Sequence, residues 1–262
     1  MDYLEIAKKA ARKAGEIQLR DLNKIKNISF KDTKGKNNIL TEIDTECEDV
    51  ILSIIKNSFP THDIVAEESG KNIENNSDFI WLIDPLDGTM NYSHSYPYFS
   101  VSIALEHKGE VVCGLVYDPF KNEMFTAEKG KGAQLNGSEI KVSVVDQLEF
   151  SLVVSGTFHH ADQEVMDKLI EILKNLSLKA QGVRRDGSAA LDLCYVACGR
   201  YESFWELGLN PWDMAAGSLI LEEAGGKVTD LKGGKFSNYN PRLIASNGLV
   251  HDEMVQLLKD YF

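Results

Sequence analysis

Two carboxylates stand three residues apart at the end of an apolar run, in the stretch WLIDPLDGT from Trp81 to Thr89. Asp84 and Asp87 have no cation near them in sequence, since neither lysine nor arginine occurs between Asn72 and His107. Acids that are crowded in an apolar setting repel each other and resist desolvation. A bound divalent cation is the simplest way to stabilise them, so the pattern indicates a metal site.

Two further segments carry acids that could complete such a site. Glu67 lies in the stretch Ala-Glu-Glu-Ser-Gly, and Asp213 follows Asn210-Pro211-Trp212. Mg²⁺ prefers oxygen ligands and often takes only a few carboxylates while it keeps waters. The backbone carbonyl of Leu86, between the two aspartates of the first segment, could be one more ligand. The predicted metal ligands are therefore Glu67, Asp84, Leu86, Asp87 and Asp213.

Each acid taken singly also has a purely structural explanation. Asp213 falls in the first turn of a predicted helix, where the helix dipole favours an acid. Glu67 and its neighbour Glu68 suit a solvated loop, and Asp87-Gly88 suits a turn. Asp84 is the hardest to explain in this way, because it ends an apolar strand. The joint occurrence of these acids favours the metal site.

Gly88 and Thr89 add a weaker indication of phosphate binding. A glycine turn that leads into a helical turn exposes backbone N–H groups, and these can bind phosphate oxygens. The hydroxyl of Thr89 could also hold a water molecule.

The elements that must position these residues can be read from periodicity and turn residues. We predict helices over residues 2–22, 42–58, 163–173, 188–198 and 252–262, and a further helix that Asn210 and Pro211 begin and Gly225-Gly226 ends. We predict strands over residues 79–84, 99–107, 111–118, 122–127, 151–155, 201–206 and 243–246. Residues 31–41 are polar and contain glycine, which indicates a mobile loop or a short hairpin.

Helices and strands come in mixed runs and do not alternate strictly. This predicts an α+β fold of layers with largely antiparallel sheets, and it argues against a Rossmann fold. We expect residues 1–262 to form a single unit. A soft boundary near residues 140–150 would divide it into an N-terminal α+β half, 1–145, and a C-terminal α/β half, 146–262.

The bulk composition narrows the class of protein. A net charge of −12 argues against nucleic-acid binding and against docking on an anionic membrane, although bound metal would still permit an anionic substrate. No run approaches 18 apolar residues, and the N-terminus lacks the apolar stretch of a secretory signal. The four cysteines match no zinc spacing. We therefore expect a cytoplasmic protein with reduced thiols.

The chain resembles the inositol monophosphatase family. One family signature is complete as WLIDPLDGTMNY from Trp81 to Tyr92, and a second as Trp212-Asp213-Met-Ala-Ala-Gly with a later Glu-Ala-Gly-Gly from Glu223. The Glu-Glu-Ser segment and the stretch GSAALDLC from Gly187 also match. The resemblance implies stacked α-β-α-β-α layers and usually a homodimer. It also implies Mg²⁺-dependent hydrolysis of a phosphate monoester that lithium often inhibits, with Mn²⁺ as a substitute metal.

The resemblance also assigns roles to residues. It implies that Glu67, Asp84 and the Leu86 carbonyl hold one metal ion, that Asp84, Asp87 and Asp213 hold a second, and that a looser third ion leans on Glu67. Asp44 would pair with Thr89 to polarise the attacking water, which makes Glu67, Thr89 and Asp44 the implied catalytic residues. The residues implied to meet the substrate are Asp87, Gly88, Thr89, Gly187, Ser188, Ala189, Glu206 and Asp213.

The substrate is a small phosphorylated polyol or sugar on this view. Met90-Asn91-Tyr92 stands where the related nucleotidases of 3′-phosphoadenosine 5′-phosphate more often carry Lys-x-Phe, which favours myo-inositol monophosphate. Glu206 suits a polyol, because a carboxylate accepts hydrogen bonds from vicinal hydroxyls. Fructose 1,6-bisphosphate, histidinol phosphate and 3′-phosphoadenosine 5′-phosphate stay open as alternatives. Arg184-Arg185 could bind a second phosphate or form ordinary ion pairs, and His159-His160 suit a polar loop.

A regulatory or scaffold role is the alternative outside enzyme chemistry. Some bacterial members of the resembled family are thought to contact the transcription machinery, so a macromolecular partner is conceivable. A degenerate scaffold should have lost its metal acids, whereas this chain carries every one. The sequence therefore favours an enzyme.

Overall fold

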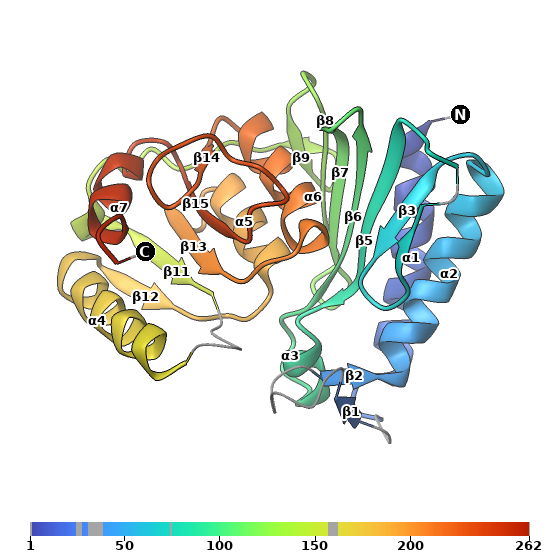
Figure 1. The fold of residues 1–262 in the computed structure, drawn as a ribbon, viewed down its shortest axis with the longest axis horizontal. Helices are drawn as coiled ribbons and strands as arrows, with labels where there is room; N and C mark the ends of the chain where they lie inside the picture. The colour runs from blue at the N-terminus through green and yellow to red at the C-terminus, as the bar shows by residue number, and fades with distance from the viewer. Residues whose placement is uncertain (1, 25–27, 31–38, 74, 157–161, 262) are drawn as a thin grey trace.

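The computed structural model describes residues 2–24, 28–30, 39–73, 75–156 and 162–261. Helices and sheets alternate in five layers (Figure 1). The helix pair α1 (Tyr3–Asp21) and α2 (Glu42–Ser58) covers one sheet, and the pair α5 (Ala189–Ala197) and α6 (Pro211–Glu223) separates it from a second sheet. Helices α4 (Gln163–Lys179) and α7 (His251–Leu258) cover the far side of that sheet. The predicted α-β-α-β-α layering is confirmed.

The larger sheet has eight strands in the order β10-β9-β8-β7-β6-β5-β3-β4. All neighbours are antiparallel except β3 and β5, which run parallel. Its strands are β3 (Asp63–Ala66), β4 (Gly70–Asn72), β5 (Phe79–Asp87), β6 (Ser100–His107), β7 (Glu110–Asp118), β8 (Glu123–Glu128), β9 (Ala133–Leu135) and β10 (Ser138–Glu139).

The smaller sheet has five strands in the order β12-β11-β13-β15-β14. They are β11 (Leu152–Ser155), β12 (Gly182–Arg184), β13 (Ser203–Leu207), β14 (Lys227–Thr229) and β15 (Arg242–Ser246). Here β11 is parallel to both β12 and β13, while β15 is antiparallel to β13 and β14. The parallel pairs arise because helices α4 and α5 return the chain between these strands. The largely antiparallel pattern that we predicted thus describes the larger sheet and only part of this one.

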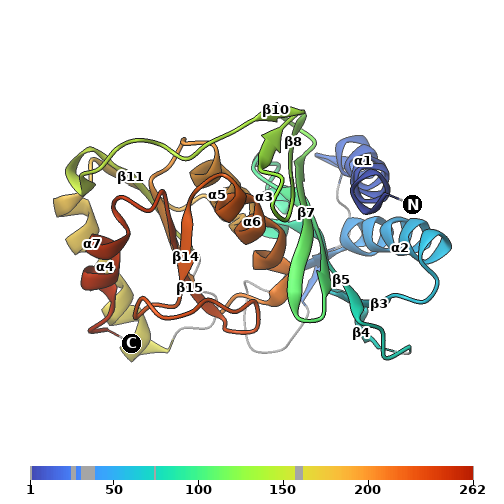
Figure 2. The ribbon, with the colours of Figure 1, turned by 90° about the horizontal axis from the view of Figure 1, so that it is seen from above.

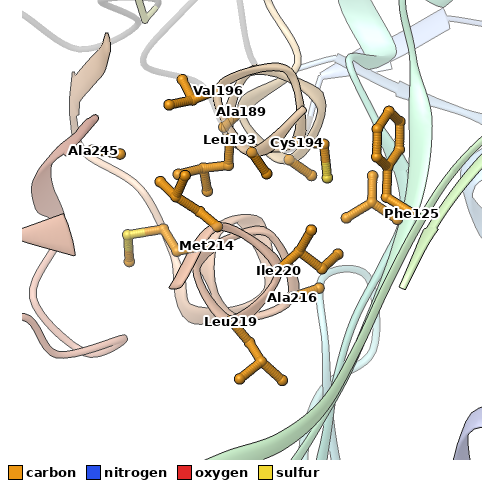
Figure 3. Packing of buried hydrophobic residues seen from close by; sticks show 14 of the residues in the cluster. Phe125, Ala189, Leu193, Cys194, Val196, Met214, Ala216, Leu219, Ile220 and Ala245 are labelled. Atoms are coloured by element: carbon orange, nitrogen blue, oxygen red, sulfur yellow. The ribbon is translucent and has the colours of Figure 1, made fainter. Parts of the chain in front are cut away.

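Helices α5 and α6 are apolar on nearly every side, because both of their faces are covered. Figure 3 shows Leu193 and Cys194 of α5 packed with Met214 and Ile220 of α6 and with Phe125 of β8. A helix that is hydrophobic all round belongs in the interior. Helix α6 packs on β5, β6, β7 and β8, so it lies directly behind the strand that carries Asp84.

Helices α1 and α2 lie side by side on the other face of the larger sheet (Figures 1 and 2). The buried side of α1 is made of small residues, among them Ala7, Ala10, Ala11 and Ala14, which allows close approach. The buried side of α2 carries Ile43, Cys47, Ile51 and Ile55, and also Asp44 and Glu48. Two carboxylates one turn apart on a buried helix face need hydrogen-bond partners.

The predicted helices and longer strands are confirmed, with some shifted ends. The strand predicted over 79–84 continues to Asp87, so Asp84 lies within the strand and does not end it. The helix predicted over 163–173 continues to Lys179, and the last helix begins at His251 and ends at Leu258. Strands of two to four residues at β3, β4, β9, β10, β12 and β14 were not predicted, because so few residues show no periodicity.

The last three residues of the polar segment 31–41 form a strand. Strand β1 (Ile28–Phe30) pairs antiparallel with β2 (Ile39–Thr41), while residues 31–38 lie outside the described residues. A short helix, α3 (Thr89–Ser93), and a 3₁₀ turn at Leu148–Phe150 complete the described elements. In the described part of the chain no helix combines the length and the apolar character that a bilayer span requires.

Candidate active site

A bulge in β5 brings Asp84 and Asp87 onto one face of the larger sheet. Asp84 pairs with Ser102 of β6 and Asp87 with Ser100, so the two residues between these aspartates oppose a single residue of β6. Side chains alternate along a strand, and residues three apart would otherwise point to opposite faces. Ser102 donates a hydrogen bond of 2.9 Å to the carbonyl of Trp212, so this face looks toward α6. The bulge therefore turns both carboxylates toward the third segment of the predicted site.

Both aspartates are buried and hydrogen-bonded. The Oδ1 atom of Asp84 accepts from the backbone N–H of Leu86 at 2.9 Å. The Oδ2 atom of Asp87 accepts from the hydroxyl of Ser188 at 2.5 Å and from the backbone N–H of Ala190 at 2.8 Å. Ser188 is the N-cap residue of α5, so the first turn of that helix meets the end of β5.

Asp213 lies in the first turn of α6, as the sequence predicts. Its Oδ2 atom accepts from the backbone N–H of Asn210 at 2.7 Å, and this bond forms half of a capping box. Pro211 takes the first helical position, where a missing N–H costs nothing. The cap holds the carboxylate at the end of α6 that faces β5.

Glu67 reaches the same region from β3. Its backbone N–H donates to the carbonyl of Ile83 at 3.1 Å, which places the turn after β3 beside the end of β5. Burial raises the pKa of Asp213 well above its ordinary value, and the negative charges of Glu67 and Asp87 add to that rise. Burial also raises the pKa of Asp87 to about 6, opposed by the bonds from Ser188 and Ala190 and helped by the charge of Glu67. The acids of three separate segments thus act on one another.

This donor set fits a hard divalent cation. It consists of carboxylates and one main-chain carbonyl, the ligands that Mg²⁺ prefers. Burial is the main cause of the two raised pKa values, and a cation would offset it together with the smaller repulsion from neighbouring carboxylates. The carboxylates are turned onto nearby N–H and hydroxyl donors, and among the described residues no three acid, histidine or cysteine side chains are placed so that they could hold one metal ion together.

A second cluster joins Asp44 to Thr89. The Oδ2 atom of Asp44 accepts from the backbone N–H and the hydroxyl of Thr41 at 2.8 and 2.6 Å. The Thr89 hydroxyl lies 2.9 Å from Oδ1 of Asp44 and 3.0 Å from the carbonyl oxygen of Leu86. Because the hydroxyl has a single hydrogen, it donates to one of these oxygens at a time. The hydroxyl can therefore link the buried acid of α2 to the carbonyl that we predict as a metal ligand.

Gly88 sits where the two halves of the chain approach closely. Its φ of +92° is in the left-handed region, and a Cβ there would lie 3.0 Å from the carbonyl oxygen of Tyr98 and 3.2 Å from that of Gly187. Gly187 has a φ of +86°. Both positions therefore require glycine.

The other residues implied to meet substrate are mostly buried. Glu206 lies against Gly156, where a Cβ would come within 1.9 Å of the Glu206 Cδ atom. Ala189 follows Ser188 in α5. The charge of Glu206 reaches α5, where it helps burial to raise the pKa of Asp192. Substrate contact at these residues stays a prediction.

The structure describes Arg184-Arg185, the pair for which the sequence left two roles open. Arg184 is exposed, and Nε of Arg185 donates to the carbonyl of Gly156 at 3.3 Å, close to Glu206. His159-His160 lie outside the described residues.

Three residues near the site were given no role of their own from the sequence. Asn91 donates to the carbonyls of Tyr98 at 2.8 Å and Asp186 at 2.7 Å, which joins α3 to the second half. Buried Gln18 of α1 donates to the carbonyl of Pro85 at 2.8 Å. Buried Glu48 of α2 accepts from the turn after Glu67. The available signal was a polar residue within an apolar helical stripe, which marks Gln18 and Glu48.

Comparisons with known proteins place the chain among relatives of known family. A model of the inositol monophosphatase family matches residues 2–261. The Nus factor SuhB of Pseudomonas aeruginosa is 41% identical over 248 residues, which are 93% of this chain and 91% of that protein. The chloroplastic phosphatase IMPL1 of Arabidopsis thaliana is 39% identical over 259 residues, which are 97% of this chain and 69% of that protein.

A solved structure shares the fold. The inositol monophosphatase from Anabaena superposes with a TM-score of 0.85 at 40% sequence identity, over 98% of this chain and 95% of that one.

Proposed function

The chain belongs to the inositol monophosphatase family, and from this premise we propose that it is a Mg²⁺-dependent phosphomonoesterase that converts myo-inositol monophosphate into inositol and phosphate. One observation carries the proposal. Burial, with added repulsion from Glu67 in the turn after β3, raises the pKa of Asp87 on β5 and of Asp213 at the start of α6. A globular protein gains nothing in stability from such repulsion, so a cation is the natural reason to keep it.

The residues that would hold the metal are Glu67, Asp84, Asp87, Asp213 and the Leu86 carbonyl. Bound Mg²⁺ would stabilise the charge that develops on the phosphoryl and leaving-group oxygens. Phosphate monoesters hydrolyse extremely slowly in water, so a large reduction of the barrier is needed.

The chain itself would orient the nucleophile. The Thr89 hydroxyl and the Asp44 carboxylate lie within hydrogen-bond distance of each other, and a water beside them would be held for in-line attack. The proton of that water would pass to this pair. The N–H groups of Gly88 and Thr89 would bind the phosphate, in the way that N–H groups at a tight glycine turn bind anions.

The second half of the chain would select the alcohol part of the substrate. Glu206, Gly187, Ser188 and Ala189 are the residues that we assign to this role. A carboxylate at position 206 accepts hydrogen bonds from the hydroxyls of a polyol. The names of the Arabidopsis and Anabaena relatives support a phosphatase and an inositol monophosphatase.

A substrate panel tests the proposal. Phosphate release is measured with and without Mg²⁺ on inositol 1-phosphate, fructose 1,6-bisphosphate, histidinol phosphate and 3′-phosphoadenosine 5′-phosphate, and lithium is titrated against the best substrate. We expect the highest kcat/KM for inositol 1-phosphate and no turnover by Asp84→Asn. A higher kcat/KM for another compound would make that compound the preferred substrate. Phosphate release that does not depend on Mg²⁺ would refute the mechanism.

A regulatory role is the second candidate, and the name Nus factor SuhB of the Pseudomonas relative favours it. Such a role would require a macromolecular partner, the alternative that the sequence left open, whereas the net charge argued only against nucleic acid and an anionic membrane. Complementation separates the roles. If Asp84→Asn restores growth to a strain that lacks this protein, the required function does not depend on phosphatase turnover.

We also propose that the protein acts as a homodimer in the cytoplasm. Its cysteines are free thiols, three of them buried, which suits a reducing compartment. Light scattering during gel filtration would show the mass of a dimer or that of a single chain.

A further inference from the structure

Glu48 is a buried acid of α2 whose two carboxylate oxygens both accept backbone hydrogen bonds. Its Oε2 atom accepts from the N–H of Glu68 at 2.8 Å, and its Oε1 atom accepts from the N–H of Ser69 at 2.8 Å. Only 3% of Glu48 is exposed. These donors are the two residues that directly follow Glu67.

Glu67 is thereby held on both sides. Its own N–H is fixed on the carbonyl of Ile83 in β5, and the next two N–H groups are fixed on Glu48. Hydrogen bonds to an ionised acceptor are shorter and stronger than neutral ones, and a carboxylate can accept two parallel bonds. The backbone around Glu67 therefore has little freedom to move.

Helix α2 delivers two acids to two parts of the site. Asp44 and Glu48 are four residues apart and so lie on the same helix face, one above the other. Asp44 contacts Thr89, and Glu48 contacts the turn after Glu67. The apolar residues of α2 pack against β5, and this packing fixes the positions of Asp44 and Glu48 along the strand.

We propose that Glu48 is a positioning residue that sets the place of Glu67 as a metal ligand. The inference rests on the proposed function, since it takes Glu67 to be a ligand. Residues that orient metal ligands from behind commonly contribute about ten- to a hundredfold to metal affinity. Glu48 acts on the metal through Glu67.

The chain offers a matched control. Asp63 is 1% exposed and also accepts two backbone hydrogen bonds, from Asn75 at 2.9 Å and from Ser77 at 2.8 Å. The turn that it holds carries no predicted ligand. Substitution of Asp63 removes the same kind of interaction at a place where the metal should not respond.

The experiment measures Mn²⁺ binding by calorimetry and the Tm of the metal-free protein for the wild type and four variants. They are Glu48→Gln, Asp63→Asn, Glu67→Gln and the double variant Glu48→Gln with Glu67→Gln. We expect Glu48→Gln to raise the Kd for Mn²⁺ about ten- to a hundredfold, because the amide places an NH₂ donor against a backbone N–H. Glu48→Gln and Asp63→Asn should lower the Tm of the metal-free protein by similar amounts. Asp63→Asn should leave the Kd for Mn²⁺ within about twofold of the wild type, because Asp63 lies at the start of β3 and Glu67 follows its other end.

The double variant decides how Glu48 acts. If Glu48 works through Glu67, the double variant should bind Mn²⁺ as weakly as Glu67→Gln alone, because an absent ligand needs no positioning. If the rise in Kd of the double variant equals the product of the rises in the two single variants, Glu48 acts independently of Glu67, for example by its charge. That result would overturn the proposal. An unchanged Kd in Glu48→Gln would also overturn it.

Failure of the proposed function gives a different result. If Asp84→Asn binds Mn²⁺ as the wild type does, the metal site itself is wrong. If Asp84→Asn loses Mn²⁺ binding and Glu67→Gln does not, the proposed metal site is supported. Glu67 is then not a ligand, and the proposal that Glu48 positions it is refuted. Should Glu48→Gln not fold, Glu48→Asp keeps the charge but shortens the reach, and it should give a smaller rise in Kd that is likewise absent in the Glu67→Gln background.

Discussion

The Thr89 hydroxyl lies 2.9 Å from Oδ1 of Asp44, a residue 45 positions earlier in the chain. The other oxygen of Asp44 belongs to the capping box of α2, where it accepts from Thr41. The residue that closes the start of a helix therefore also holds a hydroxyl beside the aspartates of β5. Local helix capping and the proposed catalytic geometry depend on the same carboxylate.

Removal of this hydroxyl should impair turnover while metal binding persists. We expect Thr89→Val to lower kcat about 10²- to 10⁴-fold, the usual contribution of a positioned proton-transfer group. Thr89→Ser keeps the hydroxyl and should stay within about tenfold of the wild type on the same scale. Steady-state kinetics with calorimetry of Mn²⁺ tests this, and a Thr89→Val enzyme with normal kcat would remove Thr89 from the mechanism.

Asp213→Asn should stabilise the metal-free protein and abolish its activity. Burial and the charges of Glu67 and Asp87 raise the pKa of Asp213, so a neutral side chain there relieves unfavourable interactions. The asparagine oxygen can still accept from the N–H of Asn210. We expect a gain of about 1 kcal/mol in the free energy of unfolding, since one pKa unit corresponds to about 1.4 kcal/mol.

The measurement is urea unfolding at pH 8 in EDTA, beside phosphate release in Mg²⁺. Turnover of Asp213→Asn, and likewise of Asp84→Asn, should fall by several orders of magnitude, as expected when a metal ligand is lost. A variant that is less stable in EDTA than the wild type would argue that Asp213 mainly serves as a cap.

The sequence predicted the acids more completely than the residues that hold them. Asp84, Asp87 and Asp213 stand next to strong local signals, namely an apolar run, an Asp-Gly turn and a helix start. Glu48 and Gln18 carry no such signal, because their roles depend on which turn packs against their helix. Periodicity shows that such residues face the interior, but it does not show what they contact there.

The fold, too, was predictable in some parts and not in others. The long elements were predictable because α1 and α2 repeat their apolar residues at helical spacing, while α6 has clear start and stop residues. The bulge between Asp84 and Asp87 was not, although it determines that both carboxylates share a face. The parallel pairing of β11 with β12 and β13 also depends on tertiary packing, which sequence patterns describe poorly.

Gly88→Ala should damage both stability and activity, whereas Gly130→Ala should affect stability alone. Both glycines have a positive φ, which costs a residue with a Cβ about 1 kcal/mol. A Cβ at Gly130 meets open space, but one at Gly88 would lie 3.0 Å from the Tyr98 carbonyl oxygen and 3.2 Å from that of Gly187. Urea unfolding and phosphate release for both variants, compared with the wild type, would show the difference.

We expect Gly130→Ala to lose about 1 kcal/mol with normal kcat/KM, and Gly88→Ala to lose more than that together with at least about tenfold in kcat/KM. The extra loss follows because the backbone must move apart where the two halves meet and where the phosphate would bind. If both substitutions lower the free energy of unfolding and kcat/KM equally, the close approach at Gly88 contributes neither to stability nor to activity.

His251 should make stability fall as the pH drops below neutrality. Its ring is fully buried at the start of α7, between Thr229 at 2.9 Å and Ser246 at 2.8 Å. Burial lowers the pKa of His251 from 6.5 to about 4, helped by Lys227 and opposed by Asp252. Between those pH values the unfolded chain binds a proton that the folded chain does not. The free energy of unfolding should therefore fall by about 1.4 kcal/mol per pH unit from pH 6.5 towards 4, and this contribution should be constant above pH 7.

The control is His251→Gln, which cannot titrate but keeps a donor and an acceptor for the two hydroxyls. Carboxylates titrate in the same range in both proteins, so the difference between their urea-unfolding curves isolates the histidine. We expect the variant to be less stable at pH 7.5 by about 1–3 kcal/mol, and the gap to narrow as the pH approaches 4.5. If the gap stays constant from pH 7.5 to 4.5, the folded protein accepts a proton on His251 as readily as the unfolded chain does.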